Sequence, residues 1–393
     1  RFTNAYVSCP VCSPTRAGLM TGRYQERFGH WYNPGPPAQA SPGFGLPLDQ
    51  ITIADLLKKA GYKTALVGKW HLGLKPEFHP MKRGFDEFFG FLHGGHSYVN
   101  AKADPDNLIL RGTEPVDEQE YLTDAFRREA VGFIERQNDG PFFLYFAPNA
   151  VHTPMEAPEK YLSRFPNISD QKRRKHAAML SALDDAVGSI LETVRKKDME
   201  RNTLVFFLSD NGGPTEGNGS SNAPLSGVKG TVLEGGIRVP LLMKWPDCLG
   251  KGKVCDDPVI SLDVLATSVA AAGGEIPTDR TMDGVDLLPF VKGKAGKPHD
   301  ALFWRYHKEA VIREGKWKLI KSDDGSARLY NLSKDVEEKK DLASEEVERV
   351  KELKDKLAKW EAELKPALWG DRAAGGGRQR RNGKRKNPSS SRG

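Results

Sequence analysis

The sequence predicts an α/β fold with a largely parallel central sheet flanked by helices, followed by a small C-terminal subdomain with an antiparallel sheet and a helix. Two observations support this prediction. Short apolar runs typical of buried strands alternate with stretches whose apolar residues recur at helical spacing, which is the order found around parallel sheets. Beyond Pro298, alternating segments joined by short turns indicate an antiparallel meander.

The elements follow in a regular order along the first part of the chain. Besides a helix that begins near Cys12, the sequence predicts helices over residues 53–61, 121–136, 177–197 and 260–272. Apolar runs predict strands over residues 62–68, 141–147 and 203–208. The later part of the chain predicts three short strands within 301–321 and a charged helix over 343–364.

These patterns divide the chain into three predicted parts: a main α/β domain over 1–298, a C-terminal subdomain over 299–370, and a disordered basic tail over 371–393. The tail holds eight basic residues and one acidic residue, which accounts for the net charge of +7 and leaves the body neutral. Contact with an anionic polymer and simple solvation are both open for this tail. Neither nucleic-acid binding by the body nor a membrane span is indicated.

The stretch 9–23 is the strongest candidate for chemistry. Cys12 stands where a helix is expected to begin, because Ser13 is a capping residue type and Pro14 is tolerated in a first helical turn. Arg16 follows one turn later on the same face. Backbone N–H groups at a helix start and a nearby guanidinium would both stabilise negative charge at Cys12. The stretch therefore predicts a nucleophile presented by a helix.

This stretch resembles the signature of the type I sulfatases of the alkaline phosphatase superfamily. The matching residues are Cys12, Ser13, Pro14, Thr15, Arg16, Thr21 and Gly22. In that family the cysteine is converted to formylglycine, an aldehyde whose hydrate carries two hydroxyls on one carbon. The resemblance implies that one hydroxyl attacks sulfur and that the other then expels sulfate, a step for which an unmodified serine or cysteine has no group.

Other interpretations of Cys12 arise from its neighbours. Together with Cys9 it forms a Cys-x-x-Cys, as in redox pairs or half of a zinc site, but Cys248 and Cys255 are spaced too widely to supply a second such motif. A thiol phosphatase would need an arginine six residues after the cysteine, and Gly18 stands there. Cys248 and Cys255 could form a disulfide or remain reduced.

Polar side chains follow each of the three predicted strands of the main domain. They are Lys69 and His71, then His152, then Asp210 and Asn211. In parallel α/β sheets, ligands bind beyond the carboxyl ends of the strands. Each group alone has an ordinary explanation, since a histidine often caps a loop and Asp-Asn-Gly-Gly forms turns readily. Their joint placement predicts one shared site.

The family resemblance gives these residues roles. Lys69 and His71 look like the groups that contact formylglycine and sulfate, His152 looks like the sulfate-binding histidine beside the leaving group, and Lys229 looks like the second sulfate-binding lysine. His152 is the first choice to protonate the leaving alcohol, with Lys229 second, while His71 would assist the elimination. The candidate catalytic residues are therefore Cys12, Arg16, Lys69, His71, His152 and Lys229.

The resemblance also implies one divalent cation, usually calcium, held by Asp210, Asn211 and the modified Cys12. It would polarise the sulfate and lower the pKa of the hydrated aldehyde, and Asp210 could accept the proton of the attacking hydroxyl. Family members carry an upstream strand that ends in paired metal-binding aspartates. We therefore expect an N-terminally truncated chain of a secreted or periplasmic protein.

Three functions agree with these residues. The leading hypothesis is hydrolysis of aryl or carbohydrate sulfate monoesters, with a sulfated small molecule or glycan as substrate and a formylglycine-generating maturation enzyme as partner. The second is hydrolysis of phosphonate or phosphate esters by the same chemistry. The third is a non-catalytic binding relative.

Overall fold

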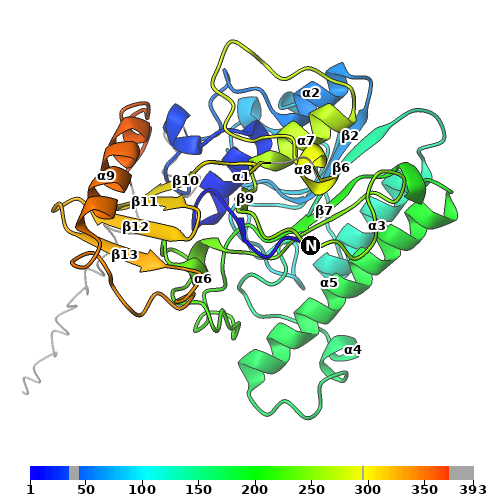
Figure 1. The fold of residues 1–393 in the computed structure, drawn as a ribbon. Helices are drawn as coiled ribbons and strands as arrows, with labels where there is room; N and C mark the ends of the chain where they lie inside the picture. The colour runs from blue at the N-terminus through cyan, green and yellow to red at the C-terminus, as the bar shows by residue number, and fades with distance from the viewer. Residues whose placement is uncertain (35–43, 294–295, 371–393) are drawn as a thin grey trace, which may run out of the picture.

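The computed structural model describes residues 1–34, 44–293 and 296–370 and shows a mixed α/β fold with a small C-terminal antiparallel sheet and helix (Figure 1). The main sheet and the C-terminal antiparallel sheet lie side by side in this view, with the short strand near the N-terminus between them. The predicted tail over 371–393 lies outside the described residues, and the predicted domain boundary at 298 stays a prediction.

The largest sheet is built around β2 (Lys63–Lys69). This strand pairs in parallel with β3 (Glu87–Phe91) on one side and with β6 (Phe142–Ala147) on the other. Beyond β3, the two-residue strands β4 (Leu110–Arg111) and β5 (Glu114–Pro115) continue the sheet in antiparallel order. Two of the three strands predicted for the main domain are thus parallel neighbours.

The prediction of a largely parallel sheet is wrong for the third strand. Strand β7 (Val205–Leu208) pairs antiparallel with β8 (Leu241–Lys244), and β1 (Ala5–Tyr6) forms a separate parallel pair with β9 (Val259–Ile260). The described residues therefore form mixed sheets in several pieces. An apolar run indicates that a strand is buried, but it does not specify the direction of its neighbour.

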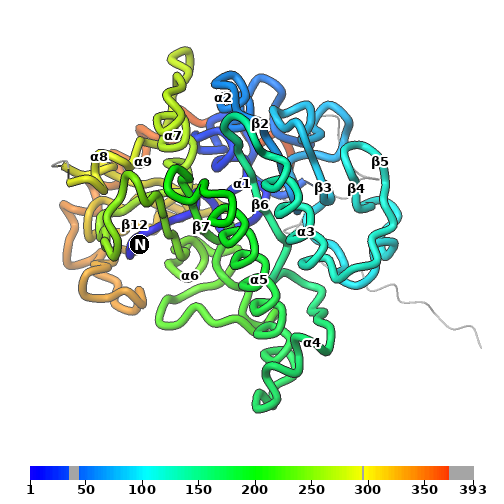
Figure 2. The backbone as a smooth tube through the Cα atoms, turned by 90° about the vertical axis from the view of Figure 1, so that its right-hand side faces the viewer, coloured from blue at the N-terminus to red at the C-terminus, as the bar shows by residue number. Residues whose placement is uncertain are grey.

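Helices cover both faces of the main sheet (Figure 2). Helices α1 (Cys12–Thr21), α2 (Ile53–Lys59) and α7 (Asp263–Ala271) share a core cluster with Leu66 of β2. Successive side chains of a strand point to opposite faces, so Val67 joins the other cluster. That cluster includes residues of helices α3 (Leu122–Glu135) and α5 (Gln171–Lys196).

Short helical segments complete the main part of the chain. They are α4 (Glu159–Leu162), α6 (Glu234–Ile237), α8 (Leu288–Val291) and the 3₁₀ turns Gln25–Phe28, Pro76–Phe78, Pro80–Lys82 and Glu200–Asn202.

The C-terminal sheet is the predicted meander with one additional strand. Strands β10 (Leu302–Tyr306), β11 (Glu309–Glu314), β12 (Trp317–Ser322) and β13 (Ala327–Asn331) pair antiparallel in sequence order. Helix α9 (Val347–Glu361) packs on this sheet through buried leucine and tryptophan side chains. The sequence prediction missed β13, whose short run has little apolar alternation.

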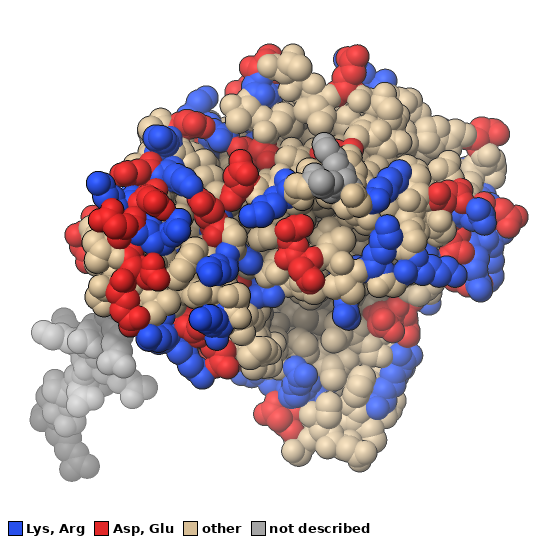
Figure 3. Space-filling view, in the orientation of Figure 1, with Lys and Arg blue, Asp and Glu red and all other residues tan. Residues whose placement is uncertain are grey.

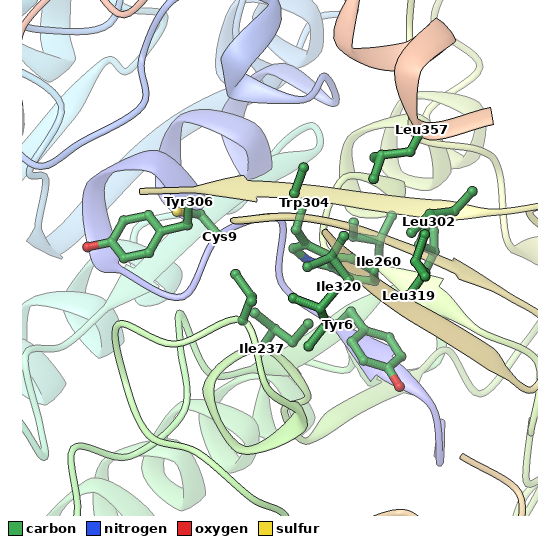
Figure 4. Packing of buried hydrophobic residues seen from close by; sticks show 14 of the residues in the cluster. Tyr6, Cys9, Ile237, Ile260, Leu302, Trp304, Tyr306, Leu319, Ile320 and Leu357 are labelled. Atoms are coloured by element: carbon green, nitrogen blue, oxygen red, sulfur yellow. The ribbon is translucent and has the colours of Figure 1, made fainter. Parts of the chain in front are cut away.

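One hydrophobic cluster joins the C-terminal sheet to the β1–β9 pair and to the segment that follows β1 (Figure 4). Tyr6 of β1 lies beside Trp304 of β10, with ring centroids 5.3 Å apart, and Ile237 and Ile260 pack in the same cluster. The Trp304 indole N–H also donates a hydrogen bond of 2.7 Å to the Val7 carbonyl. The C-terminal sheet is therefore packed directly against the segment that leads into Cys12.

The visible surface carries both signs of charge, interspersed over the C-terminal sheet and the main part (Figure 3). This distribution agrees with the neutral body expected from the sequence. Among the described residues, no helix combines the length and the apolar composition needed to cross a membrane.

Trp304→Ala should lower the free energy of unfolding by about 3–5 kcal/mol, because it leaves a cavity in the shared cluster and an unpaired Val7 carbonyl. Denaturant unfolding measures this change. Val347→Ala is the control, since Val347 is 62% exposed and its truncation should change stability by less than about 0.5 kcal/mol. Equal effects of the two substitutions would contradict the assigned packing.

Candidate active site

Cys12 is the first residue of α1, as the sequence predicts, and its side chain is buried. The helix cap differs from the expectation. The N-cap residue is Val11, in extended conformation, and its apolar side chain makes no capping hydrogen bond. The Ser13 hydroxyl instead donates a hydrogen bond of 2.6 Å to the carbonyl of His71, while the Ser13 N–H donates to Asn33 Oδ1 at 3.0 Å. Ser13 therefore joins the start of α1 to the segment after β2.

Positive charge and hydrogen-bond donors surround the Cys12 thiol. The Lys229 ammonium donates to Cys12 Sγ at 3.1 Å, and His152 and His71 also lie within hydrogen-bonding reach of the sulfur. Burial by itself raises the pKa of this thiol. The charge of Lys69, the hydrogen bonds from the two histidines and the charge of Lys229 outweigh burial and hold the pKa well below its usual value. The site thus stabilises negative charge at position 12.

Strand β2 delivers two of these groups at its carboxyl end. Lys69 is 1% exposed, and burial lowers the pKa of its ammonium. His71 follows with a φ of 63°, a left-handed conformation that is uncommon for residues other than glycine. Burial and the positive charge of Lys69 lower the pKa of His71 to about 3, so its imidazole is neutral near pH 7.

Arg16 connects the helix to the other strands. Two of its N–H groups donate to one carboxylate oxygen of Asp210, at 2.9 and 3.1 Å, and a third donates to the Lys69 carbonyl at 2.8 Å. The Tyr145 hydroxyl of β6 lies 3.4 Å from the same guanidinium. Burial raises the pKa of Asp210, as does the negative charge at Cys12, but the neighbouring cations outweigh both and hold this pKa below its usual value. Asp210 is therefore ionised and tied to α1.

His152 is the partly exposed histidine of the site. Its Nδ1 lies 2.8 Å from the Thr153 carbonyl, which can only accept, so Nδ1 carries the proton. The Nε2 atom then accepts in the neutral ring and donates in the imidazolium form. The Tyr98 hydroxyl, shared between the carbonyls of Asn149 and His152 at 2.7 and 2.9 Å, fixes the backbone beneath the ring.

Lys229 reaches the site from a loop rather than from a strand end. Its backbone N–H donates to the Gly213 carbonyl at 3.1 Å, and the next N–H, of Gly230, donates to the Pro10 carbonyl at 3.0 Å. These two bonds hold Lys229 between the segment that precedes Cys12 and the segment that follows Asp210. The structure thus brings together all six candidate catalytic residues.

Asp210 and Asn211 offer oxygen donors to a cation. Asn211 Oδ1 is a buried carbonyl oxygen without a hydrogen-bond partner, and Asp210 is ionised, so both suit a hard cation. Among the residues that the structure describes, no three His, Cys, Asp or Glu side chains are grouped to hold a metal. The pair therefore fits calcium in chemical type and supplies only part of the six to eight oxygen ligands that calcium takes.

The family model described as "Sulfatase" matches residues 1–274, which include every residue of the site described in this section. The chain belongs to the sulfatase family. A second model, "N-sulphoglucosamine sulphohydrolase, C-terminal", matches residues 228–363 and so covers the antiparallel sheet and α9 of this sulfatase-family chain.

Curated relatives carry sulfatase names. N-acetylgalactosamine-6-sulfatase of Mus musculus is 37% identical over 342 residues, covering 81% of this chain and 64% of the relative. Arylsulfatase A of Homo sapiens is 34% identical over 361 residues, covering 83% of this chain and 68% of the relative. The chain thus spans less than two thirds of the mouse relative's length.

Solved structures agree with this membership. Ps i-CgsB, crystallised in complex with k-i-k-neocarrahexaose, is 36% identical with a TM-score of 0.89, and the match covers 95% of this chain and 87% of that chain. The phosphonate monoester hydrolase SpPMH from Silicibacter pomeroyi has a TM-score of 0.64 at 18% identity, which shows a shared fold only.

Several contacts of this sulfatase site were missed by sequence reasoning. His30 is fully buried, and its Nε2 lies 2.7 Å from the Ser13 hydroxyl, which already donates to His71. The His30 Nε2 atom must therefore carry a proton and donate it to the Ser13 hydroxyl. This hydrogen bond helps to hold the start of α1 in place. Tyr145 beside Arg16 was missed as well. Neither residue stands in a motif, so no local signal could have found them.

His71 and His30 should not titrate between pH 5 and 8, because burial lowers the pKa of each to about 3. NMR of histidine-labelled protein measures this, with assignments from single His→Gln variants. A midpoint near 6.5 for His71 would contradict its placement. Lys69→Met should raise the pKa of His71 by removing a nearby positive charge, whereas Lys82→Met at an exposed position should leave it unchanged.

Proposed function

We propose that this chain hydrolyses sulfate monoesters, with sulfated carbohydrates as the substrate class. The observation that carries this proposal is the convergence of Lys69, Lys229 and two histidines on buried Cys12 at the start of a helix. Such a site suits a tetrahedral anion bound next to a nucleophile. Sulfatases among the relatives support the activity, and a relative named for N-acetylgalactosamine and a structure holding a hexaose support the substrate class.

The nucleophile in this proposal is formylglycine made from Cys12 by a maturation enzyme. When present, that group supplies a hydrated aldehyde with one hydroxyl to attack sulfur and another to expel sulfate. The cationic neighbours of Cys12 support this assignment, because they outweigh burial and hold the pKa of the unmodified thiol below its usual value. Asp210, ionised beside Arg16, is the group we assign to accept the proton of the attacking hydroxyl.

Two lysines bind the sulfate oxygens in this account. Lys69 is buried at the end of β2, and Lys229 approaches Cys12 from the opposite loop, so their ammonium groups can contact the sulfate on two sides. Their ammonium groups would stabilise the negative charge that develops on the sulfate oxygens.

We assign protonation of the leaving alcohol to His152. Its Nδ1 proton is engaged by the Thr153 carbonyl, so the imidazolium form presents the Nε2 proton to the site. His71, neutral and buried, is assigned to assist release of the sulfate, with Ser13 holding its carbonyl. Lys229 is the second choice for the leaving-group proton.

Asp210 and Asn211 would supply part of the ligand shell of one calcium ion. When bound, this cation would polarise the sulfate and lower the pKa of the attacking hydroxyl. The orphaned Asn211 Oδ1 supports the assignment.

Cys12→Ala should abolish hydrolysis of an aryl sulfate, a loss of at least about 10³-fold, because it removes the nucleophile. Cys9→Ala should retain most activity, since Cys9 is buried in the core cluster and its carbonyl, which accepts from Thr15, is unaffected. Initial rates are measured on protein produced with the maturation enzyme. Peptide mass spectrometry should find the modification at Cys12 and an intact thiol at Cys9.

Matched esters test the reaction itself. The same protein should hydrolyse a sulfate ester and sulfated oligosaccharides with higher kcat/KM than the corresponding phosphate ester. Faster turnover of phosphate or phosphonate would contradict the proposal, as would turnover that survives loss of Cys12.

A further inference from the structure

The mechanism leaves one cluster of buried charges unexplained. Lys318 of β12 forms ion pairs with Glu234 at 2.9 Å and with Glu338 at 2.8 Å, and all three side chains are fully buried. Removing charged groups from water is costly, so such a cluster persists only when each member is paired. We call Glu234, Lys318 and Glu338 the buried triad.

The buried triad also holds backbone groups in place. One carboxylate oxygen of Glu338 accepts a hydrogen bond of 2.7 Å from the Glu234 N–H. The second carboxylate oxygen of Glu234 accepts from the Tyr6 hydroxyl at 2.6 Å, and Arg313 donates to that hydroxyl. Glu234 is therefore fixed from the C-terminal sheet and from β1 at once.

Glu234 stands at the base of the loop that presents Lys229, which we call the Lys229 loop and define as residues 226–236. The loop is closed by a hydrogen bond of 2.6 Å from the Gly235 N–H to the Ser226 carbonyl. The Ser226 hydroxyl donates to the carbonyl of Glu337, the neighbour of Glu338, at 2.5 Å. Both ends of the Lys229 loop are thus anchored on the C-terminal segment.

Glycine packing leaves this loop little freedom to adjust. A Cβ atom on Gly235 would lie 2.4 Å from the Gly227 carbonyl oxygen, and one on Gly236 would lie 2.0 Å from that of Thr231. The segment after Asp210 also packs tightly against the Lys229 loop, since a Cβ on Gly212 would lie 1.8 Å from the Gly235 carbonyl oxygen. Because backbones touch backbones here, the Lys229 loop has little room to shift relative to Glu234 or to the segment after Asp210.

We propose that the buried triad positions the Lys229 loop, so that the C-terminal sheet sets the separation of the Lys229 ammonium from residue 12. The catalytic consequence rests on the proposed function, which assigns Lys229 to the sulfate. Glu234, Lys318 and Glu338 are positioning residues, because their contacts reach the site through the loop.

The test uses the double variant Lys318→Met/Glu338→Gln, which removes one charge of each sign. The control is Lys321→Met on the same strand, whose ammonium pairs with Glu361 of α9 and has no contact in common with the triad. With thermal unfolding showing both proteins folded, the double variant should lose at least tenfold in kcat/KM on a sulfate ester. The control should change less than about twofold.

Combination with Lys229→Ala separates positioning from general destabilisation. If the triad acts through Lys229, adding the double variant to Lys229→Ala should cause no further loss. If the fold losses in kcat/KM of the double variant and of Lys229→Ala multiply when the substitutions are combined, the inference is overturned. If the double variant does not fold, the single variant Glu338→Gln, which keeps an acceptor oxygen for the Glu234 N–H, goes through the same cycle.

Crystal structures make the test independent of activity. In protein made without the maturation enzyme, the separation of Lys229 Nζ from Cys12 Sγ should increase from 3.1 Å to beyond about 4 Å in the triad variant. An unchanged separation would overturn the inference. A wild-type protein that hydrolyses no sulfate ester would instead contradict the proposed function and leave this structural comparison intact.

Discussion

The geometry of the site depends on the contacts of Arg16. Its guanidinium donates to Asp210 after β7, to the Lys69 carbonyl at the end of β2 and toward Tyr145 on β6, so one side chain joins α1 to three strands. Arg16 is buried and Asp210 is partly buried, so removing either charge would leave the other poorly compensated. Because Arg16 lies one turn after Cys12, the same contacts fix where the thiol faces. Two lysines add positive charge that the carboxylate of Asp210 alone does not balance, and this excess favours a bound anion.

Local sequence signals predicted most elements of the fold. Periodicity located α3, α9 and β2 to within a few residues, because their buried faces repeat at the spacing of a helix or follow a strand pattern. The same signals could not show that β7 pairs antiparallel with β8, since pairing direction depends on residues far apart in the chain. Strand β13 was missed because its sequence, Ala327–Asn331, carries little alternation.

The site was predictable to the extent that strand ends define it. Lys69 ends β2 and Asp210 follows β7, and they were expected near one another because the sequence predicted both strands in one parallel sheet. They do meet at Arg16, although β7 pairs with β8 in a separate sheet. Lys229 lies in a loop, so the family resemblance alone singled it out. The contacts of His30 with Ser13 and of Lys318 with Glu234 could not be predicted, because no local sequence pattern relates these residues. The C-terminal sheet therefore enters the account of the site only through its three-dimensional packing.

We propose that four separate segments of the chain form one sulfate-binding centre at Cys12. The most direct measurement is a crystal structure of the Cys12→Ala variant, which cannot turn over, with a bound aryl sulfate. We expect the sulfate group to contact the ammonium groups of Lys69 and Lys229 and the His152 ring. Density for the sulfate elsewhere, for example in the cavity of about 350 Å³ lined by Arg238 and Arg313, with the Cys12 site empty, would contradict this proposal.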